Sequence, residues 1–572
     1  MEIFEYQQAS SVIVKLAALS LADEEALSAI FRRFAGQPFT LQGLNEVTRG
    51  RLSGADIRAS IPVLLQQGYL HAVKKVWGER LYYIPFDLLP QLQEMYVLPS
   101  IRSYDGLDVF LYRESRRGLA CDMFRTLAWI SMNRLQITAK GTLYQKVLSK
   151  IGGLISLESE DIMGLSLYYP YQEVYAPPVA VVFDMLIAFD LIVQEHGEWL
   201  LNQVNVRSWL KLDLEEMNAA FFRQIMLRYV PTDAVLQHFV FGITSSSIQS
   251  GMWYGLQNVL DSLEQQGIFT GSLLPEQQLW MRSWLIALCG FGWMELGQGR
   301  DEKLYLRWVD KPDMMRERGG VPEGVHLHTG LCHVQPDFEI LVPPDVSFTV
   351  RWELESCFEH ITMDIMSLYR ISRLSVTQAV RNGRSSKDIL TLLEEHSTGV
   401  PEHVRLAIEQ WGREMDQTKH DERMRIINGT QETADFRVSI NRVNGLLGRQ
   451  GWIYCGSEYK NYEYDDGIPE VHDLFPGLED TPVMWIKEMR AYHASTTRKI
   501  IVQALLWRTK IALKIRGEVV ECLPLAVVGE ENWKVRGLMF LKEENKGAEH
   551  ELAPGEWEAI QLLLPDIKRK ML

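Results

Sequence analysis

The sequence lacks the features of three common classes of protein. Its six cysteines lie scattered between Cys121 and Cys522 without a Cys-x-x-Cys pair, which argues against a disulfide framework and indicates reduced thiols. No apolar run approaches the roughly 20 residues that a membrane helix needs. The opening residues, MEIFEYQQAS, show no basic stretch before an apolar one, so no export signal is visible. We therefore expect a cytoplasmic protein without a membrane partner.

Motifs that would supply catalytic chemistry are also missing from these residues. A P-loop needs the string G-x-x-x-x-G-K-S/T to bind phosphates, and the nearest glycine-rich piece, GLLGRQG, has neither the lysine nor the hydroxyl. No D-E-x-H, G-x-S-x-G or H-E-x-x-H string occurs. Cys332, His333, Cys357 and His360 make a poor zinc set, because neighbouring side chains on a strand point to opposite faces. We predict a non-enzymatic protein with no cofactor and no metal.

Length and charge indicate several soluble domains with local basic surfaces. A chain of 572 residues exceeds the roughly 250–300 residues that one core supports, which suggests three to five domains. The net charge of −15 argues against a general nucleic-acid coat. Residues 113–150 and 484–520 nevertheless each carry eight Lys/Arg against two acids, and residues 45–85 carry six against three. Such stretches can form DNA-binding faces, although chance clustering on solvated helices gives the same counts.

The first stretch, residues 10–85, has the element order of a winged helix. The pattern predicts a helix over 24–34, a turn of helix capped by Thr40, and a third helix over 54–67 capped by Ser53. A hairpin of two short strands follows. DNA readers of this type place the third helix in the major groove, although winged helices also serve as protein-binding modules. The candidate DNA contacts are the basic residues of this unit: Arg49, Arg51, Arg58, Lys74, Lys75 and Arg80.

The order "helix, apolar strand, turn, apolar strand" recurs near residues 179–201 and 278–308, which predicts three winged-helix-like units. The second unit starts with a helix over 119–132 and continues through a capped turn at 138–142. The helix over 178–190 is apolar all round, so we expect it to be buried rather than to read DNA. The better candidates for phosphate contacts are the basic residues of this unit: Arg116, Arg117, Lys140, Lys146 and Lys150.

The stretch from His333 to Glu414 has the most specific pattern. An alternating strand with Phe338, Ile340 and Val342 ends at a Pro-Pro pair. A long helix is predicted over 351–366. Three shorter helices are predicted around 376–382, 387–395 and 401–411, with serine caps at Ser372 or Ser375 and at Ser385 or Ser386.

This stretch resembles the small domain attached to XPB-type DNA helicases, which also occurs in bacterial helicase-associated proteins without a motor. The resemblance rests on the order of four motifs, at Val334–Asp345, Leu368–Ser372, Asn382–Ser385 and Glu409–Trp411. The T-x-K-G segment beginning at Thr138 is similar to the same family. The resemblance implies binding to duplex or junction DNA and a role in delivering or regulating a separate helicase or nuclease in DNA repair.

Two polar, acidic stretches, 416–436 and 456–481, are predicted to be linkers, and Asp465 and Asp466 are expected to be solvated there rather than catalytic. One helix and one strand are predicted between them, over residues 439–455.

The last segment is expected to hold helices over 484–494 and 496–509, three strands over 510–543, and a final helix over 554–564. Short strands joined by tight polar turns predict a small curled sheet or barrel. The segment resembles a divergent WYL domain, with Trp533 retained from the named tripeptide and Leu523-Pro524-Leu525 at the proline-containing strand. The arginine-rich ligand face of that family is not evident in the sequence.

We therefore predict a multidomain α+β fold: mostly helical winged-helix-like units, a small α/β domain of the XPB N-terminal type and a C-terminal β-barrel-like domain. The expected boundaries are 1–95, 96–205, 206–325, 326–415, a connecting region 416–481, and 482–572. The leading hypothesis is a DNA-binding, helicase-associated adaptor. A winged-helix/WYL transcription regulator and a protein scaffold without DNA binding stay open as alternatives, and the net charge favours the scaffold.

Overall fold

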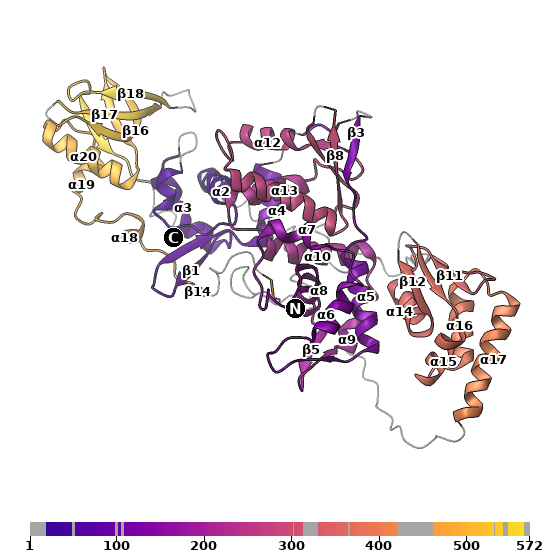
Figure 1. Cartoon of the computed structure of the whole chain (residues 1–572). Coiled ribbons are helices and arrows are strands. Elements are labelled where there is room, and N and C mark those ends of the chain that lie inside the picture. The colour runs from indigo at the N-terminus through magenta and orange to yellow at the C-terminus, as the bar shows by residue number, and fades with distance from the viewer. Residues whose placement is uncertain are drawn as a thin grey trace.

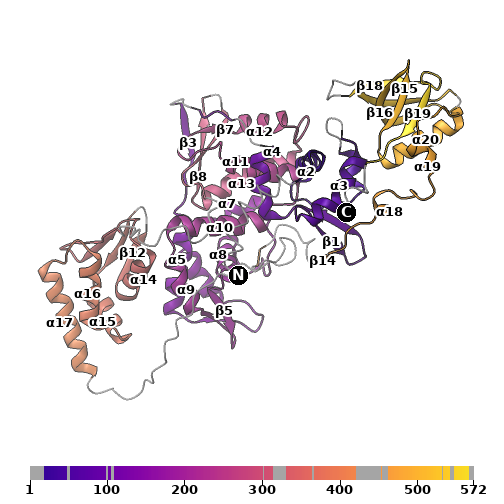
Figure 2. The same cartoon turned by 180° about the vertical axis from the view of Figure 1, so that it is seen from behind.

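The computed structural model describes residues 19–47, 52–97, 101–104, 108–300, 302–312, 330–363, 366–419, 452–453, 462–530, 532–540 and 547–565. Three bodies are evident in Figure 1: a central body formed by residues 19–312, a second body formed by 330–419 and a third body formed by 471–565. The second and third bodies lie on opposite sides of the central body, and the reverse view in Figure 2 shows the same arrangement.

The central body repeats one order of elements three times. The first copy contains α2 (Leu21–Phe34), η1 (Gly43–Glu46), α3 (Gly54–Gln66), β1 (His71–Lys75) and β2 (Arg80–Tyr83). The second contains α5 (Leu119–Met132), β4 (Leu135–Gln136), α6 (Gln145–Gly152), α8 (Pro177–Ala188), β5 (Ile192–Glu195) and β6 (Glu198–Leu201). The third contains α11 (Ala234–Thr244), β7 (Tyr254–Gly255), α12 (Leu256–Gln265), α13 (Pro275–Gly290), β8 (Met294–Gly299) and β9 (Leu304–Trp308).

Each copy also has the same strand pairing. The short extended segment between its first two helices pairs antiparallel with the second strand of its hairpin, through Phe39↔Tyr82 in the first copy, β4 with β6 in the second and β7 with β9 in the third. We refer to the copies as the first, second and third units. Side-chain hydrogen bonds stabilise the start of α3, where Ser53 and Asp56 form a reciprocal capping box.

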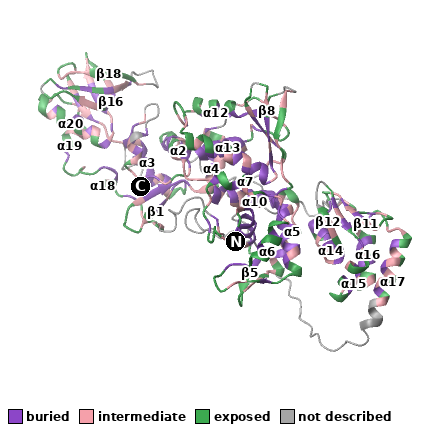
Figure 3. Ribbon diagram, viewed as in Figure 1, coloured by how far each residue is buried: buried purple, intermediate pink, exposed green. Residues whose placement is uncertain are grey.

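The remaining elements of the central body join the units. They are η2 (Phe86–Leu88), α4 (Leu89–Tyr96), β3 (Val109–Arg113), α7 (Ser159–Ile162), η3 (Met163–Leu165), α9 (Gln203–Trp209) and α10 (Leu214–Tyr229). One apolar core runs through the whole body, from Ala26 to Trp308, and the buried segments in Figure 3 follow it. Every residue of α8 from Pro178 to Leu186 is buried, as its all-round apolar sequence predicts.

The second body is a four-stranded antiparallel sheet with helices packed against it. Its elements are β10 (His333–Val334), β11 (Glu339–Val342), α14 (Phe348–Cys357), β12 (Glu359–Met363), β13 (Ser367–Arg370), α15 (Arg373–Arg381), α16 (Ser386–His396) and α17 (Glu402–Lys419). The strand order is β10-β11-β13-β12. Ser372 and Ser385 cap α15 and α16, which confirms one of the two serines proposed for each start.

Two expectations for this body are wrong. The long helix predicted over 351–366 begins earlier, at Phe348, and ends at Cys357, where Phe358 turns to extended geometry. The following residues form β12, because β-branched Ile361 and Thr362 favour a strand and β13 offers them a partner. The helix predicted to end near Trp411 continues to Lys419, so the first residues of the expected linker are helical.

The third body has two short helices and one longer helix, followed by a five-stranded antiparallel sheet. It contains α18 (Val471–Leu474), α19 (Val483–Lys487), α20 (Ala494–Trp507), β15 (Ile511–Ile515), β16 (Glu518–Val528), β17 (Lys534–Phe540), β18 (Ala548–Leu552) and β19 (Ala559–Leu562). The order is β18-β17-β16-β15-β19, and the three strands expected over 510–543 are β15, β16 and β17. Within the described residues β18 and β19 are edges, so the sheet is open rather than a closed barrel.

The helix predicted over 554–564 is wrong. Residues 559–562 form β19, which pairs with β15 and buries Ile560 and Leu562 on alternate positions. That period of two is a strand pattern, but over four residues it does not distinguish a strand from the end of a helix. The helix expected over 484–494 is also shorter, since α19 ends at Lys487.

The region predicted as a second linker returns to the central body. β14 (Tyr462–Tyr464) pairs antiparallel with β1 and makes a three-stranded sheet with the hairpin of the first unit. Asp465, which we expected in solvent, follows this strand and is mostly buried.

Candidate nucleic-acid interface

The second unit presents a group of exposed cations around α6. Lys146 and Lys150 are one turn apart on this helix, and Lys140 lies in the turn before it. Arg134, just before β4, is exposed as well. Leu148 and Ile151 on the opposite side of α6 are buried, so the amphipathic helix holds its lysines outward. We call Arg134, Lys140, Lys146 and Lys150 the α6 cations.

Local hydrogen bonds fix the turn that carries Lys140. The hydroxyl groups of Thr138 and Thr142 lie 3.0 Å apart, and the Gly141 N–H donates to the Thr138 carbonyl. Gly141 has a φ of 82°, a conformation that favours glycine. The predicted cap and turn at 138–142 are therefore present, and they lead into Tyr144, which precedes α6 and is 50% exposed.

Other cations of the same basic stretch are neutralised inside the protein. The buried carboxylate of Asp161 accepts hydrogen bonds from Arg113 and, at 2.9 Å, from Nε of Arg116. Arg116 also lies 2.7 Å from Glu158. Partial burial alone would lower the pKa of Arg116, but these two acids raise it above its ordinary value. Arg117 is exposed just before α5. The sequence count of +6 thus overstates the positive charge that reaches solvent.

Arg58 does not fit the DNA contact predicted for it. Its guanidinium is buried, donates to Oδ1 of Asn45 at 2.7 Å and to the carbonyl of Trp507, and lies 5.3 Å from the centre of the Phe475 ring. Burial lowers its pKa to about 10. Arg58 therefore joins the first unit to the third body. Arg49 and Arg51, the neighbouring candidates, lie outside the described residues.

The basic residues of the first hairpin are engaged in ion pairs. Arg80 lies 2.6 Å and Lys74 3.3 Å from the Asp465 carboxylate. Burial alone would raise the pKa of Asp465, but the Gly467 N–H and these two cations lower it below its usual range. Lys75 pairs with Glu79 at 2.8 Å and lies over the Trp77 ring.

The third helix of each unit is covered to a different degree. In α3, Gly54 to Pro62 are buried except for the half-buried Asp56, and Ala55 and Ala59 belong to the core of the third body. α8 lies in the central core. α13 exposes Gln278, Leu279 and Arg282, its only positively charged residue. A base-reading helix must enter the major groove, and neither α3 nor α8 presents a face that could do so.

The second body is attached to the central body by contacts that sequence reasoning missed. Arg125 of α5 forms an ion pair with Glu355 of α14, and the Phe124 ring lies 5.4 Å from the Phe348 ring. The Thr349 hydroxyl donates to the Leu210 carbonyl at 3.0 Å. Burial raises the pKa of Glu355, and Arg125 partly offsets this. No local signal could reveal the pair, because 230 residues separate its members.

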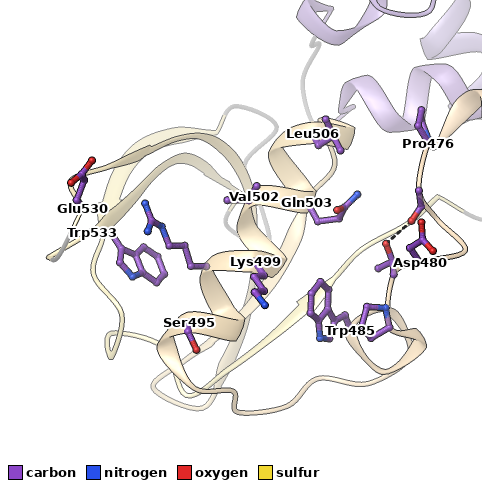
Figure 4. A pocket seen from close by; sticks show the side chains of 14 residues that line it. Pro476, Asp480, Trp485, Ser495, Lys499, Val502, Gln503, Leu506, Glu530 and Trp533 are labelled. Atoms are coloured by element: carbon purple, nitrogen blue, oxygen red, sulfur yellow. Dashed lines mark hydrogen bonds between the residues drawn. The ribbon is translucent and has the colours of Figure 1, made fainter.

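The third body has a groove of about 930 Å³ along α20 (Figure 4). Val502, Leu506 and Trp485 give it apolar surface, and Trp533 lies at its other side. Its charged lining residues are Arg498, Lys499, Asp480 and Glu530. The groove has room for a small amphipathic molecule, but its charges are balanced and do not select an ion of one sign.

The family comparison identifies one stretch of the chain. Residues 332–441, about a fifth of the 572 residues, match the model described as helicase conserved C-terminal domain. The described part of this match is the second body. No curated protein matches the chain. Over the described part of the chain, no helix has both the length and the apolar character needed to span a bilayer.

Proposed function

We propose that this protein is a helicase-associated adaptor that binds duplex DNA through its phosphates and leaves strand separation to a separate helicase or nuclease. The observation that supports this most is the set of α6 cations. These side chains are exposed, and within the described residues none of them has an acidic partner. The helicase-type match in the second body supplies the association with nucleic-acid enzymes.

The expected mode of binding is independent of base sequence. Phosphate contacts position a protein on DNA, whereas base contacts in the grooves specify the sequence. The α6 cations are suited to phosphates, and the helices that could read bases in the first two units are buried. We therefore propose that the protein recognises the duplex backbone rather than an operator.

The finer assignments follow the sequence resemblances. We propose that the three units are winged-helix modules, because each has the order helix, short strand, helix, helix and hairpin with the same pairing. The second body would be an XPB N-terminal-like domain, and the third a divergent WYL-like domain. Since no P-loop string occurs in these residues, we also propose that the chain does not hydrolyse ATP.

Fluorescence anisotropy tests the proposal directly. Two unrelated duplexes, a forked duplex and a single strand should be titrated at 50 mM salt, with phosphate release from ATP measured in the same mixtures. We expect micromolar binding to both duplexes with less than a tenfold difference, and no DNA-stimulated phosphate release. Absence of binding to every form at low salt would refute the adaptor.

A transcription regulator is the second candidate, and the groove along α20 is the observation that favours it. It predicts a preference of about 10³ or more for one sequence over random DNA. The protein scaffold, favoured by the net charge of −15, predicts no DNA binding at moderate salt.

A further inference from the structure

A short piece of the chain that is distant from the second unit in sequence is inserted into the core of that unit. Trp452 and Ile453 lie between the second and third bodies in sequence, yet Ile453 is fully buried in the central core and Trp452 packs against it. The indole of Trp452 stacks on Phe183 of α8 with ring centres 5.9 Å apart, and it meets Tyr175 edge-on at 5.2 Å. The ring of Trp199 on β6 is the third aromatic neighbour, with its centre 6.1 Å from that of the Trp452 ring.

A buried charged group recognises the backbone of the same two residues. The Asp184 carboxylate accepts the N–H groups of both Trp452 and Ile453, at 2.5 and 2.9 Å. It also accepts from Arg228 at 2.5 Å and from the Tyr229 hydroxyl at 2.8 Å. Arg228 in turn donates to the Ile453 carbonyl at 3.4 Å.

This arrangement has the properties of a binding site rather than of ordinary core. The side chains of Asp184 and Arg228 are both completely buried. Burying an ion pair costs free energy unless further hydrogen bonds satisfy its polar atoms. Here two peptide N–H groups donate the additional hydrogen bonds to the Asp184 carboxylate. Burial and the Asp184 charge raise the pKa of Tyr229, which keeps its hydroxyl protonated as a donor. Without the dipeptide, Asp184 would lose two of its four donors.

We propose that the central body carries a peptide-recognition site whose ligand is the Trp452–Ile453 dipeptide of this same chain. The site is formed by Tyr175, Phe183, Asp184 and Trp199 of the second unit together with Arg228 of α10. The aromatic rings pack against the indole, and the ion pair forms hydrogen bonds with the backbone of both residues. The bound dipeptide acts as a latch, because it holds the chain to the central body between α17, which ends at Lys419, and β14, which starts at Tyr462.

The latch returns the chain to the unit that holds the α6 cations. Tethering makes the dipeptide an intramolecular ligand with an effective concentration of roughly millimolar order. A free peptide of the same sequence should therefore compete poorly with it. DNA binding by the α6 cations is not needed for this inference, and the two can fail separately.

The test uses the full chain with Trp452→Ala and a labelled peptide spanning residues 449–456 in which serine replaces Cys455. We expect the peptide to bind the Trp452→Ala protein at least tenfold more tightly than the wild type, whose site is occupied. Adding Asp184→Asn to the Trp452→Ala protein should weaken its binding of the peptide at least tenfold. A peptide with alanine in place of the tryptophan is the matched control and should not bind.

Limited proteolysis gives a second measurement. Trp452→Ala should be cut between residues 420 and 461 at least tenfold faster than the wild type, whereas Trp485→Ala, a tryptophan of the third-body groove, should leave that rate unchanged. Equal peptide affinities for wild type and Trp452→Ala, or unchanged cleavage, would overturn the latch. If Trp452→Ala loses its cooperative thermal transition, the peptide must restore it, and failure to do so would also overturn the proposal.

Discussion

Neutralising two of the α6 cations should change the salt dependence of DNA binding in a quantitative way. Lys146→Gln and Lys150→Gln remove two exposed charges from one face of α6 and leave its buried residues Leu148 and Ile151 in place. Glutamine is a good helix former, so the helix should persist. The variant therefore tests charge at this surface rather than folding.

The magnitude follows from counterion release. If the four α6 cations each neutralise a phosphate, the slope of log K against log salt is about −3.6, which is roughly a 150-fold loss of affinity between 50 and 200 mM salt. Two remaining contacts give a slope of about −1.8 and roughly a 12-fold loss over the same range. At 100 mM salt the variant should bind about 60-fold more weakly than the wild type, if the two lines meet near 1 M.

The assay is fluorescence anisotropy on one duplex at five salt concentrations. The matched control is Lys211→Gln with Lys534→Gln, which removes the same charge from two exposed lysines elsewhere. We expect the control to keep the wild-type slope within about 0.5. If the control loses as much slope as the α6 variant, binding reflects overall charge and the assignment to α6 is refuted.

Three further outcomes are expected. Burial lowers the pKa of His238 to about 4, so its neutral form stabilises the fold fully above pH 6.5. About 2–3 kcal/mol of this stability is lost as the pH falls to 4.5. Urea titrations should show a smaller loss for His238→Gln, and equal losses would contradict the prediction. Arg125→Leu leaves the Glu355 carboxylate buried without its cation and should destabilise the protein by about 3–5 kcal/mol. Adding Glu355→Gln to the same chain should recover part of this stability. A change below about 1 kcal/mol in denaturant unfolding would be inconsistent with the prediction. Phe110 and Tyr112 are 62% and 63% exposed on the edge strand β3, where an apolar edge favours aggregation. Replacing both by lysine should therefore reduce the light scattering of the protein on heating. Unchanged scattering would show that this edge does not drive aggregation.

Helix starts were predictable from the sequence because they depend on local chemistry. Ser53, Ser372 and Ser385 cap the helices that follow them, as serine side chains do wherever they meet free N–H groups. The burial of α8 was predictable from its all-round apolar composition. The strands β12 and β19 were missed because each is short and is stabilised by a partner strand that local pattern does not reveal.

The candidate interface was only partly predictable for a related reason. Sequence identifies which residues carry charge, but not which charges face water. Arg58 and Arg116 look like Lys146 in a count of basic residues, yet Arg58 is buried beneath the third body and Arg116 is paired with Asp161. Lys74 and Arg80 share Asp465, which lies almost 400 residues further along the chain.

The sequence by itself determined the helix caps, the threefold recurrence of one element order and the similarity of one stretch to a helicase-associated domain. Those properties depend on residues that are neighbours in the chain. Only the tertiary structure decided which cations stay exposed, that α3 and α8 are covered, and that Trp452 and Ile453 occupy a site in the second unit. These depend on burial and on pairing between distant residues, because the free energy of a charge is set by its solvent and its partners rather than by its place in the sequence.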